Sequence, residues 1–402
     1  MLRLGTSVPS DPARPVRRPP GPEGVPEGIA RPGPRAAERS EAVNMAVLCE
    51  HVNLAAYTTL RLGGPARRFV EAATEDELVA AVRRADEDGE NVLVLGGGSN
   101  LVVADEGFDG TVVHVAGRGV TRRTDPRHPG KVLVTAQAGE EWEPFVARCV
   151  TEGLAGVECL SGIPGLVGAT PIQNVGAYGQ DVAETVVGVR AYDRRAREIV
   201  TLDHAACGFT YRSSVFKGSD RYVVLDVTFA LEETEESRPV AYAELARTLD
   251  VRTGERVPLH DARKAVLELR RGKGMVLDPA DPDTRSAGSF FTNPVLDAAQ
   301  LAELERRVAD RLGPDAAFPR YPETGGRAKT SAAWLIDRAG FTKGHALGPV
   351  RISTKHTLAL TNPDGAGRTA DLLALARQVR DGVREAFGVE LVNEPVMIGV
   401  RL

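Results

Sequence analysis

The stretch that decides the fold is "LSGIPGLVGATPIQNVGAYG", residues 160–179. It holds so many Gly, Pro and small residues that it cannot form a regular helix or strand. It is not a solvated linker either, because it contains no charged residue and several apolar ones, among them Ile163 and Val175. This composition is typical of a buried loop that packs on a planar ligand and offers backbone amides as hydrogen-bond donors.

Two further glycine-rich stretches precede this loop. "LGGGSN" (95–100) follows an apolar strand, and "RLGGPAR" (61–67) reads as a corner between a strand and a turn. Glycines let a backbone approach a ligand closely, and successive amides can cradle a phosphate. Neither stretch matches a dinucleotide-binding or P-loop motif, so each taken alone is better explained as a structural turn. Three such loops in one sheet-rich region nevertheless favour a large anionic cofactor.

Strand and helix patterns divide the chain into a sheet-rich first part and a helix-rich second part. Alternating or continuous apolar residues predict strands at 66–74, 91–95, 110–116, 131–139, 186–202 and 221–231. Helical spacing predicts helices at 75–89, 141–153, 261–274, 296–313, 330–340 and 369–388, followed by a terminal strand. We therefore expect an α+β fold, with a boundary near residues 260–266.

Composition limits the class of protein. A chain of 402 residues suggests two or three domains, and a net charge of −5 with mixed charges argues against nucleic-acid binding. No apolar run reaches the roughly 18 residues that span a bilayer. The four cysteines lack any CxxC pair and the seven histidines are scattered, so we expect buried reduced thiols and no metal site.

Residues 1–44 are rich in Pro, Arg and Gly and almost empty of large apolar residues. Such a segment cannot bury enough surface to offset its chain entropy, so we expect a disordered extension. It lacks the apolar core of a secretory signal. Two alternatives stay open: a basic arm that touches an anionic partner, or a chain whose synthesis starts at Met45.

Six motifs, in order along the chain, carry a resemblance to a known family. They are "VLGGGSNLVVAD", "SGIPGLVGATPIQNVGAYGQ", "YRSSVFK", "AGSFFTNPV", "AAWLIDRAGFTKG" and "ELVNEPVMIG". Over residues 46–402 the chain resembles the UDP-N-acetylenolpyruvoylglucosamine reductases. The resemblance implies NADPH-dependent reduction of UDP-N-acetylglucosamine enolpyruvate to UDP-N-acetylmuramate through non-covalently bound FAD, in peptidoglycan precursor synthesis. "TPIQNVGAYG" and "VAYAELARTL" are similar to the subclass that carries an extra tyrosine loop.

The family's architecture implies a domain plan. The expected parts are a two-part FAD-binding domain of the vanillyl-alcohol-oxidase (PCMH) type at 45–118 and 119–265, and a smaller α+β substrate-binding domain at 266–402. The last strand either stays in that domain or returns to the flavin domain. The resemblance also implies a cytoplasmic monomer whose partners are small molecules.

Three catalytic residues carry over by motif. Reduction of the enolpyruvyl group places negative charge on the carboxylate and C2, which requires donors already aimed at it. Arg212 in "YRSSVFK" would grip the carboxylate, and Glu394 in "ELVNEPV" would share a proton with it. Ser289 in "AGSFF" would give the proton to C2, with Phe290 and Phe291 keeping water out. A helix cap is a poor alternative for Ser289, because Pro294 intervenes before the next helix.

Binding residues carry over in the same way. The resemblance assigns cofactor contacts to residues of the three glycine-rich loops, namely Arg61, Gly63, Gly96, Gly97, Gly98, Ser99, Asn100, Ser161, Gly162, Ile163, Gly165, Gly168, Gln173, Asn174, Gly176 and Tyr178. It assigns substrate contacts to Tyr211, Tyr242, Arg270, Lys273 and Asn293. The spacing from Lys273 to Ser289 is longer than in the family, which leaves Arg271 as an alternative to Lys273. The ending also departs from the family pattern at Asn393 and Val396, although the glutamate keeps its place.

Two other functions are weighed against the reductase. An oxidase of the same fold would pass electrons to oxygen, but it has no need for the serine of "AGSFFTNP". A non-catalytic module that holds a nucleotide sugar would be colourless. His114 lies on an apolar strand and is interpreted as an ordinary, partly buried histidine, which leaves no attachment point for a covalent flavin.

Overall fold

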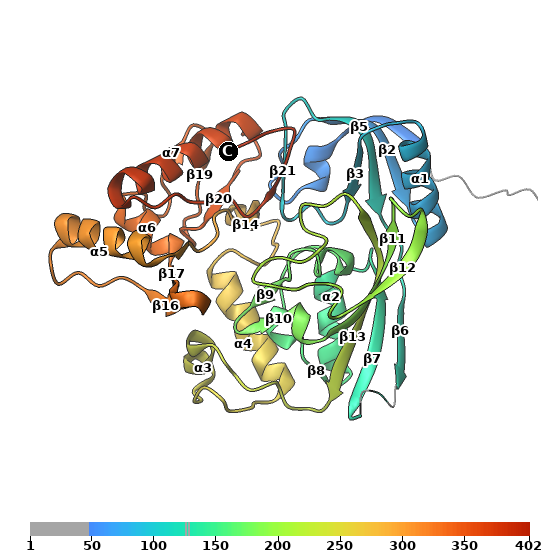
Figure 1. The fold of residues 1–402 in the computed structure, drawn as a ribbon, viewed down its shortest axis with the longest axis horizontal. Coiled ribbons are helices and arrows are strands. Elements are labelled where there is room, and N and C mark those ends of the chain that lie inside the picture. The colour runs from blue at the N-terminus through green and yellow to red at the C-terminus, as the bar shows by residue number, and fades with distance from the viewer. Residues whose placement is uncertain (1–47, 125–126, 128) are drawn as a thin grey trace, which may run out of the picture. The chain divides into compact units, whose positions relative to one another are not determined.

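The computed structural model describes residues 48–124, 127 and 129–402 (Figure 1). The extension predicted at residues 1–44 lies outside the described residues. The predicted α+β class is confirmed, since two larger sheets are followed by a region in which helices pack on short strands.

The first sheet has the strand order β1-β2-β5-β3. Its strands are β1 (Leu48–Asn53), β2 (Pro65–Ala72), β5 (Phe108–Val115) and β3 (Val92–Leu95). β1 is antiparallel to β2, whereas β2, β5 and β3 run parallel. Helix α1 (Glu75–Glu87) begins at a capping box made by Thr74 and Glu77 and buries its apolar face against this sheet.

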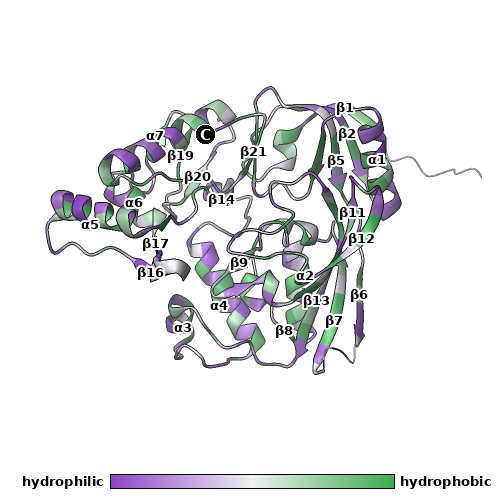
Figure 2. Ribbon diagram, viewed as in Figure 1, coloured by the Kyte–Doolittle hydropathy of each residue, from purple (hydrophilic) through white to green (hydrophobic). Residues whose placement is uncertain are grey.

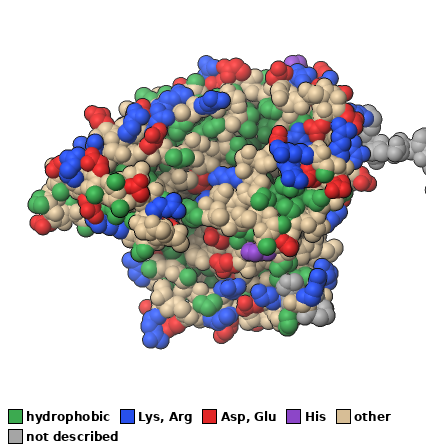
Figure 3. Space-filling model, in the orientation of Figure 1, with side chains coloured by type: hydrophobic (Ala, Val, Ile, Leu, Met, Phe, Trp, Pro, Cys, Tyr) green, Lys and Arg blue, Asp and Glu red, His purple; other side chains and the backbone are tan. Residues whose placement is uncertain are grey.

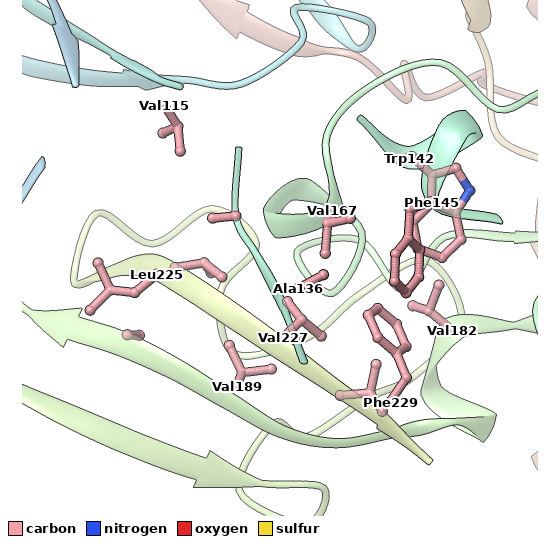
Figure 4. Close-up of a cluster of buried hydrophobic side chains, with 14 of the residues drawn as sticks. Val115, Ala136, Trp142, Phe145, Val167, Val182, Val189, Leu225, Val227 and Phe229 are labelled. Atoms are coloured by element: carbon pink, nitrogen blue, oxygen red, sulfur yellow. The ribbon is translucent and has the colours of Figure 1, made fainter. Parts of the chain in front are cut away.

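The second sheet is antiparallel throughout. Its order is β12 (Glu198–Asp203), β11 (Val186–Asp193), β13 (Tyr222–Glu233), β7 (Lys131–Gln137) and β6 (Val120–Thr124), and β8 (Leu154–Ala155) also pairs with β13. Helix α2 (Trp142–Thr151) packs beside it. Figure 4 shows the rings of Trp142, Phe145 and Phe229 lying against one another, with centroids 5.2–5.9 Å apart. This core is continuous with the apolar face of α1, so the two sheets share one interior.

Helices α3 (Ala243–Leu249) and α4 (Leu259–Gly272) follow the second sheet and form a small core with Cys159. Helix α4 also contacts α2. The boundary predicted after residue 265 falls inside α4, which runs unbroken through it. The apolar face of α4 belongs to the core of the preceding part.

The last part holds two small sheets and three helices. One sheet is β14 (Ser286–Ser289), β20 (Ala359–Thr361), β19 (Val350–Ile352) and β18 (Ala346–Leu347), and the other is β15 (Val295–Leu296), β17 (Ala328–Thr330) and β16 (Arg320–Pro322). Helices α5 (Ala298–Leu312), α6 (Ala332–Arg338) and α7 (Thr369–Phe387) pack over them. Both α5 and α7 show apolar and polar faces in Figure 2, as their predicted periodicity requires.

The C-terminal strand leaves this part. β21 (Val396–Ile398) pairs in parallel with β4 (Leu101–Val103), which directly follows the "LGGGSN" loop. The backbone amide of Val396 donates to the carbonyl of Asn100 at 2.9 Å. This pairing brings the "VNEPV" motif, nearly 300 residues later in the chain, next to the first glycine loop.

The remaining composition-based expectations can be checked against the described residues. Cys149, Cys159 and Cys207 are buried free thiols, and burial raises the pKa of Cys149 to about 12, but Cys49 is exposed, contrary to expectation. Basic and acidic side chains are interspersed on the face that Figure 3 presents. In the described part of the chain, no helix is long and apolar enough to cross a membrane. Nor do three His, Cys, Asp or Glu side chains of that part gather closely enough to hold a metal ion.

Candidate active site

A cavity of about 440 Å³ opens beside the first glycine loop. It is lined by the segment Ala56–Thr59, Arg61, Gly96, Gly97, His114, and residues of the segment 277–285 that leads into β14. Of the predicted cofactor residues, only Arg61, Gly96 and Gly97 are among those that line it. Its volume lies in the range of cofactor pockets.

Several lining residues were not predicted from the sequence. Tyr57, His114 and Arg285 all face this cavity. The ring of His114 lies 5.4 Å from that of Tyr57, and its Nδ1 is 3.3 Å from Glu71. His114 is half-buried, as interpreted, but no pattern in its strand indicates that the strand ends at a cavity. Tyr57 lies four residues before the start of the glycine-containing stretch 61–67, and that neighbourhood is the one signal that could have identified it.

The first and second glycine loops meet backbone to backbone. A Cβ on Gly97 would lie only 2.8 Å from the Cα of Gly165, and a Cβ on Gly98 would lie 1.9 Å from the carbonyl oxygen of Tyr57. Gly98 also has φ +59°, a conformation that favours glycine. Since Gly96 and Gly97 expose main chain to the cavity between the cationic Arg61 and Arg285, the site suits an anionic nucleotide such as FAD.

The second glycine loop uses many of its amides within the protein. The amide of Gly162 donates to Glu143, and that of Gly168 donates to the carbonyl of Ala138 at 2.9 Å. Ser161 is fully buried, and its hydroxyl donates to the carbonyl of Glu158 at 2.7 Å. The expectation that this loop offers its amides to a ligand is therefore wrong at Gly162 and Gly168, because both are already satisfied by neighbouring segments.

Other predicted cofactor residues also act as links between segments. Gly63 has φ +122° and little room for a side chain against Val103. The hydroxyl of Ser99 donates to the carbonyl of Pro164 at 3.0 Å, tying the first loop to the second. The side chain of Asn174 donates to the carbonyl of Thr210 at 3.0 Å and accepts from the amide of Ala183 at 3.1 Å. Ile163 is partly buried against the shared core.

Ser289 and Glu394 lie on adjacent backbone segments. Ser289 ends β14, and the amide of Glu394 donates to the carbonyl of the next residue, Phe290, at 2.9 Å. Phe290 and Phe291 are each 1% exposed, and their rings meet edge to face. Helix α5 is capped by Asp297, so Ser289 caps nothing there, as predicted. The two buried phenylalanine rings therefore form an apolar wall next to Ser289.

A chain of side chains joins Glu394 to both glycine loops. The side-chain Nδ2 of Asn100 donates to Gln173 Oε1 at 2.7 Å, and Gln173 Nε2 donates to Glu394 Oε1 at 3.4 Å. Burial raises the pKa of Glu394, and the nearby charges of Arg212 and Lys217 oppose part of that rise. A carboxyl held in this way can keep a proton when an exposed one would have lost it.

Arg212 lies in a turn beside the second loop. Its guanidinium donates to the carbonyl of Asn174 at 3.1 Å, to the carbonyl of Gly176 at 2.6 Å, and to Asp181 Oδ1 at 3.2 Å. Its positive charge acts on Glu394 and opposes part of the rise in the pKa of that carboxyl. The structure thus brings the three predicted catalytic residues to one region from three separate parts of the sequence.

The predicted substrate residues divide into two groups. Tyr242, in the tyrosine loop, packs its ring on that of Tyr178 at 5.5 Å with an interplanar angle of 90°. Lys273 Nζ lies 5.5 Å from the Tyr178 ring centroid and 2.6 Å from Glu244. Arg271 is exposed on the last turn of α4, whereas Lys273 is partly buried.

The second group is more dispersed. Arg270 donates to the carbonyl of Met275 at 2.8 Å, and its Nε is buried without a hydrogen-bond partner. Asn293 Oδ1 accepts from the amide of Ala332 at 3.0 Å, so part of this side chain is used to start α6. Tyr211 is half exposed, with Lys329 Nζ 4.6 Å from its ring.

Comparisons with known proteins match this geometry. Residues 66–202 match an FAD binding domain, a range that includes strands of both large sheets, and residues 279–398 match the C-terminal domain of UDP-N-acetylenolpyruvoylglucosamine reductase. The chain is 64% identical over 353 residues to the UDP-N-acetylenolpyruvoylglucosamine reductase of Thermobifida fusca, covering 88% of this chain and 98% of that protein. It is 60% identical to the enzyme of the same name from Streptomyces coelicolor, over 87% of this chain and 90% of that protein.

A solved structure supports the same assignment. The crystal structure of the Thermus caldophilus enzyme of this name superposes on this chain with a TM-score of 0.58 and 25% sequence identity. The match covers 88% of this chain and 98% of that one. These relatives are matched over nearly their full length. The chain belongs to the UDP-N-acetylenolpyruvoylglucosamine reductase family.

Proposed function

We propose that this protein reduces UDP-N-acetylglucosamine enolpyruvate to UDP-N-acetylmuramate, with NADPH as the reductant and Ser289, Arg212 and Glu394 as the catalytic residues. FAD, bound in the cavity beside the first glycine loop, would supply the hydride-transfer chemistry that amino-acid side chains lack. Gly96, Gly97, Arg61, Tyr57 and Arg285 would hold it, since they line the cavity. The remaining steps depend on residues of the chain.

Arg212 and Glu394 would stabilise the charge that develops on the substrate carboxylate. A planar guanidinium pairs well with a carboxylate, and it is already fixed here by two carbonyls and Asp181. Glu394 with a raised pKa can donate a proton to the same carboxylate. Because both groups are in place before the charge appears, no reorganisation is needed at that moment.

Ser289 would deliver the proton to C2. A serine hydroxyl is a weak acid, so this role needs a strongly basic carbanion-like intermediate and the absence of competing water. The buried Phe290 and Phe291 supply a dry wall immediately after the serine. Tyr242 and Lys273, which both lie against the ring of Tyr178, would bind the diphosphate-linked part of the substrate.

The observation that carries the proposal is the placement of Ser289 beside Glu394 by the hydrogen bond between Glu394 and Phe290. A non-catalytic binding module has no use for this arrangement, and neither has an oxidase that passes electrons to oxygen. The proposal also includes a cytoplasmic monomer, as the family suggests. Size-exclusion chromatography with light scattering would measure the mass in solution.

An anaerobic two-step experiment tests the reaction. The FAD-loaded protein is first reduced with NADPH, and UDP-N-acetylglucosamine enolpyruvate is then added while the flavin absorbance is followed. Rapid return of the oxidised spectrum together with a lactyl ether product would support the reductase. A flavin that stays reduced until air is admitted would favour the oxidase instead.

A further inference from the structure

Arg212 is held in a backbone conformation that it would not adopt by itself. It sits in a turn in which the amide of Thr210 donates to the carbonyl of Ser213 at 2.9 Å, and the reverse bond is 3.2 Å. Within this turn Arg212 has φ +52°, the left-handed region that residues with a Cβ rarely occupy. Such a conformation persists only where neighbouring groups fix it, and it is frequent at functional sites.

One carboxylate, that of Asp181, pairs with the guanidinium of Arg212. Asp181 Oδ1 lies 3.2 Å from Arg212 Nη1, and the arginine side chain is only 22% exposed. The carbonyls of Asn174 and Gly176 accept the other hydrogen bonds. Asp181 is the one charged member of this set of partners, so its carboxylate favours the orientation in which the guanidinium makes these contacts.

The β9–β10 hairpin (Gly176–Ala177 and Gln180–Asp181) is shaped around this pair. Gly176 and Asp181 are directly opposite partners in it. A Cβ at residue 176 would lie 1.5 Å from Asp181 Oδ1 and 2.6 Å from Arg212 Nη1. Only glycine leaves room for the carboxylate to reach the guanidinium, which gives Gly176 a steric role.

A second residue fixes the main chain of Arg212. Lys217 Nζ donates to the carbonyl of Arg212 at 2.9 Å, five residues further along the same motif. Its charge also acts on Glu394. Lys217 therefore fixes the main chain of Arg212, and Asp181 fixes its guanidinium.

We propose that Asp181 and Lys217 are positioning residues that hold Arg212 in the orientation needed to bind the substrate carboxylate. The inference rests on the proposed function, in which Arg212 makes that contact. Neither residue belongs to the catalytic set, since each acts through Arg212. The prediction that distinguishes this role from general support of the fold is selectivity for ligands that carry the carboxylate.

Ligand binding to the oxidised, FAD-loaded protein provides the test. UDP-N-acetylmuramate carries a lactyl carboxylate, whereas UDP-N-acetylglucosamine lacks it. Asp181→Asn should weaken binding of UDP-N-acetylmuramate by about 10- to 100-fold, the range expected for loss of a hydrogen bond to a charged group. Binding of UDP-N-acetylglucosamine should change by less than about threefold, because this ligand has no carboxylate for Arg212 to bind. Lys217→Met should show the same selectivity with an independent substitution.

Controls separate failure of this inference from failure of the proposed function. Asp86, on α1, forms a comparable ion pair with Arg194 at 2.6 Å. Asp86→Asn removes this carboxylate and should leave the affinities for both ligands unchanged. If Arg212→Ala leaves UDP-N-acetylmuramate binding unchanged, the proposed role of Arg212 is itself wrong. If Arg212→Ala weakens it selectively but Asp181→Asn and Lys217→Met do not, or weaken both ligands equally, the positioning role is overturned.

Discussion

Replacement of Gly97 by alanine tests whether the contact between the first two glycine loops builds the cofactor cavity. The new Cβ would lie 2.8 Å from the Cα of Gly165 and 3.2 Å from its carbonyl carbon, both of them backbone atoms. Carbon atoms settle at roughly 3.5–4.0 Å, so the two loops must separate by several tenths of an ångström. Overpacking of this kind costs about 1–3 kcal/mol. Gly97 has no left-handed φ, so the cost is steric.

Gly96 is the matched control for this substitution. A Cβ there would meet Leu166 and Ala169 only at 3.8–4.0 Å, which is ordinary van der Waals contact. In the protein without FAD, urea unfolding should therefore show a loss of about 1–3 kcal/mol for Gly97→Ala and less than about 0.5 kcal/mol for Gly96→Ala.

The same displacement should weaken FAD binding, because Gly97 exposes main chain to the cavity. Each 1.4 kcal/mol of lost binding free energy raises the Kd about tenfold. Titration of FAD by fluorescence quenching should show a Kd for Gly97→Ala at least about tenfold higher than that of the parent chain. Equal stability of the two alanine variants, with FAD affinity unchanged in Gly97→Ala, would refute the stacked-loop reasoning.

Three further predictions concern single side chains. Ser289→Ala should leave flavin reduction by NADPH intact but slow reoxidation by the enolpyruvyl substrate by about 10²- to 10⁴-fold in stopped-flow absorbance, and fast reoxidation would remove Ser289 from the mechanism. Because burial raises the pKa of Glu394, activity that needs its proton should fall as the pH rises through that pKa. Glu394→Gln should remove this fall in activity at high pH and slow only the reoxidation of the flavin by substrate. A selective loss of FAD in this variant would instead assign Glu394 to the cofactor. Arg221 donates to Asp193 and holds the pKa of that carboxyl down at about 2, so the stability it contributes is complete above the ordinary carboxyl pKa and is lost as the pH falls toward 2. Asp193→Asn should lower the urea midpoint at pH 7, and a difference from the parent chain that does not shrink in acid would contradict this account.

Local sequence patterns predicted the secondary structure well. The helical spacing at 75–89 and 296–313 becomes α1 and α5, and the apolar stripe of 369–388 becomes α7. These elements depend on contacts between residues a few positions apart, which periodicity records directly. The expected boundary after residue 265 falls inside α4, since the core that receives a helix depends on the tertiary structure.

The candidate site was predictable only where it follows from motifs. Ser289, Arg212 and Glu394 came from family resemblance, and the cavity-lining Tyr57, His114 and Arg285 were missed because they are distant in sequence and carry no motif of their own. The glycine loops were identified from their composition as places where backbones approach closely, as Gly97 and Gly165 do. Which of their amides face a ligand depends on neighbours such as Glu143 and Ala138, which no local pattern reveals.

The sequence by itself determined the elements and the chemical types available to the site: helices from periodicity, turns from glycine, and a serine, an arginine and a glutamate within recognisable motifs. The tertiary structure alone decided that β21 pairs with β4, placing Glu394 beside both Ser289 and the first glycine loop. It also decided that Asp181 meets Arg212 across a hairpin. The physical reason is that strand pairing and side-chain contact between distant segments depend on burial in a common core, which is a property of the whole chain rather than of any one stretch.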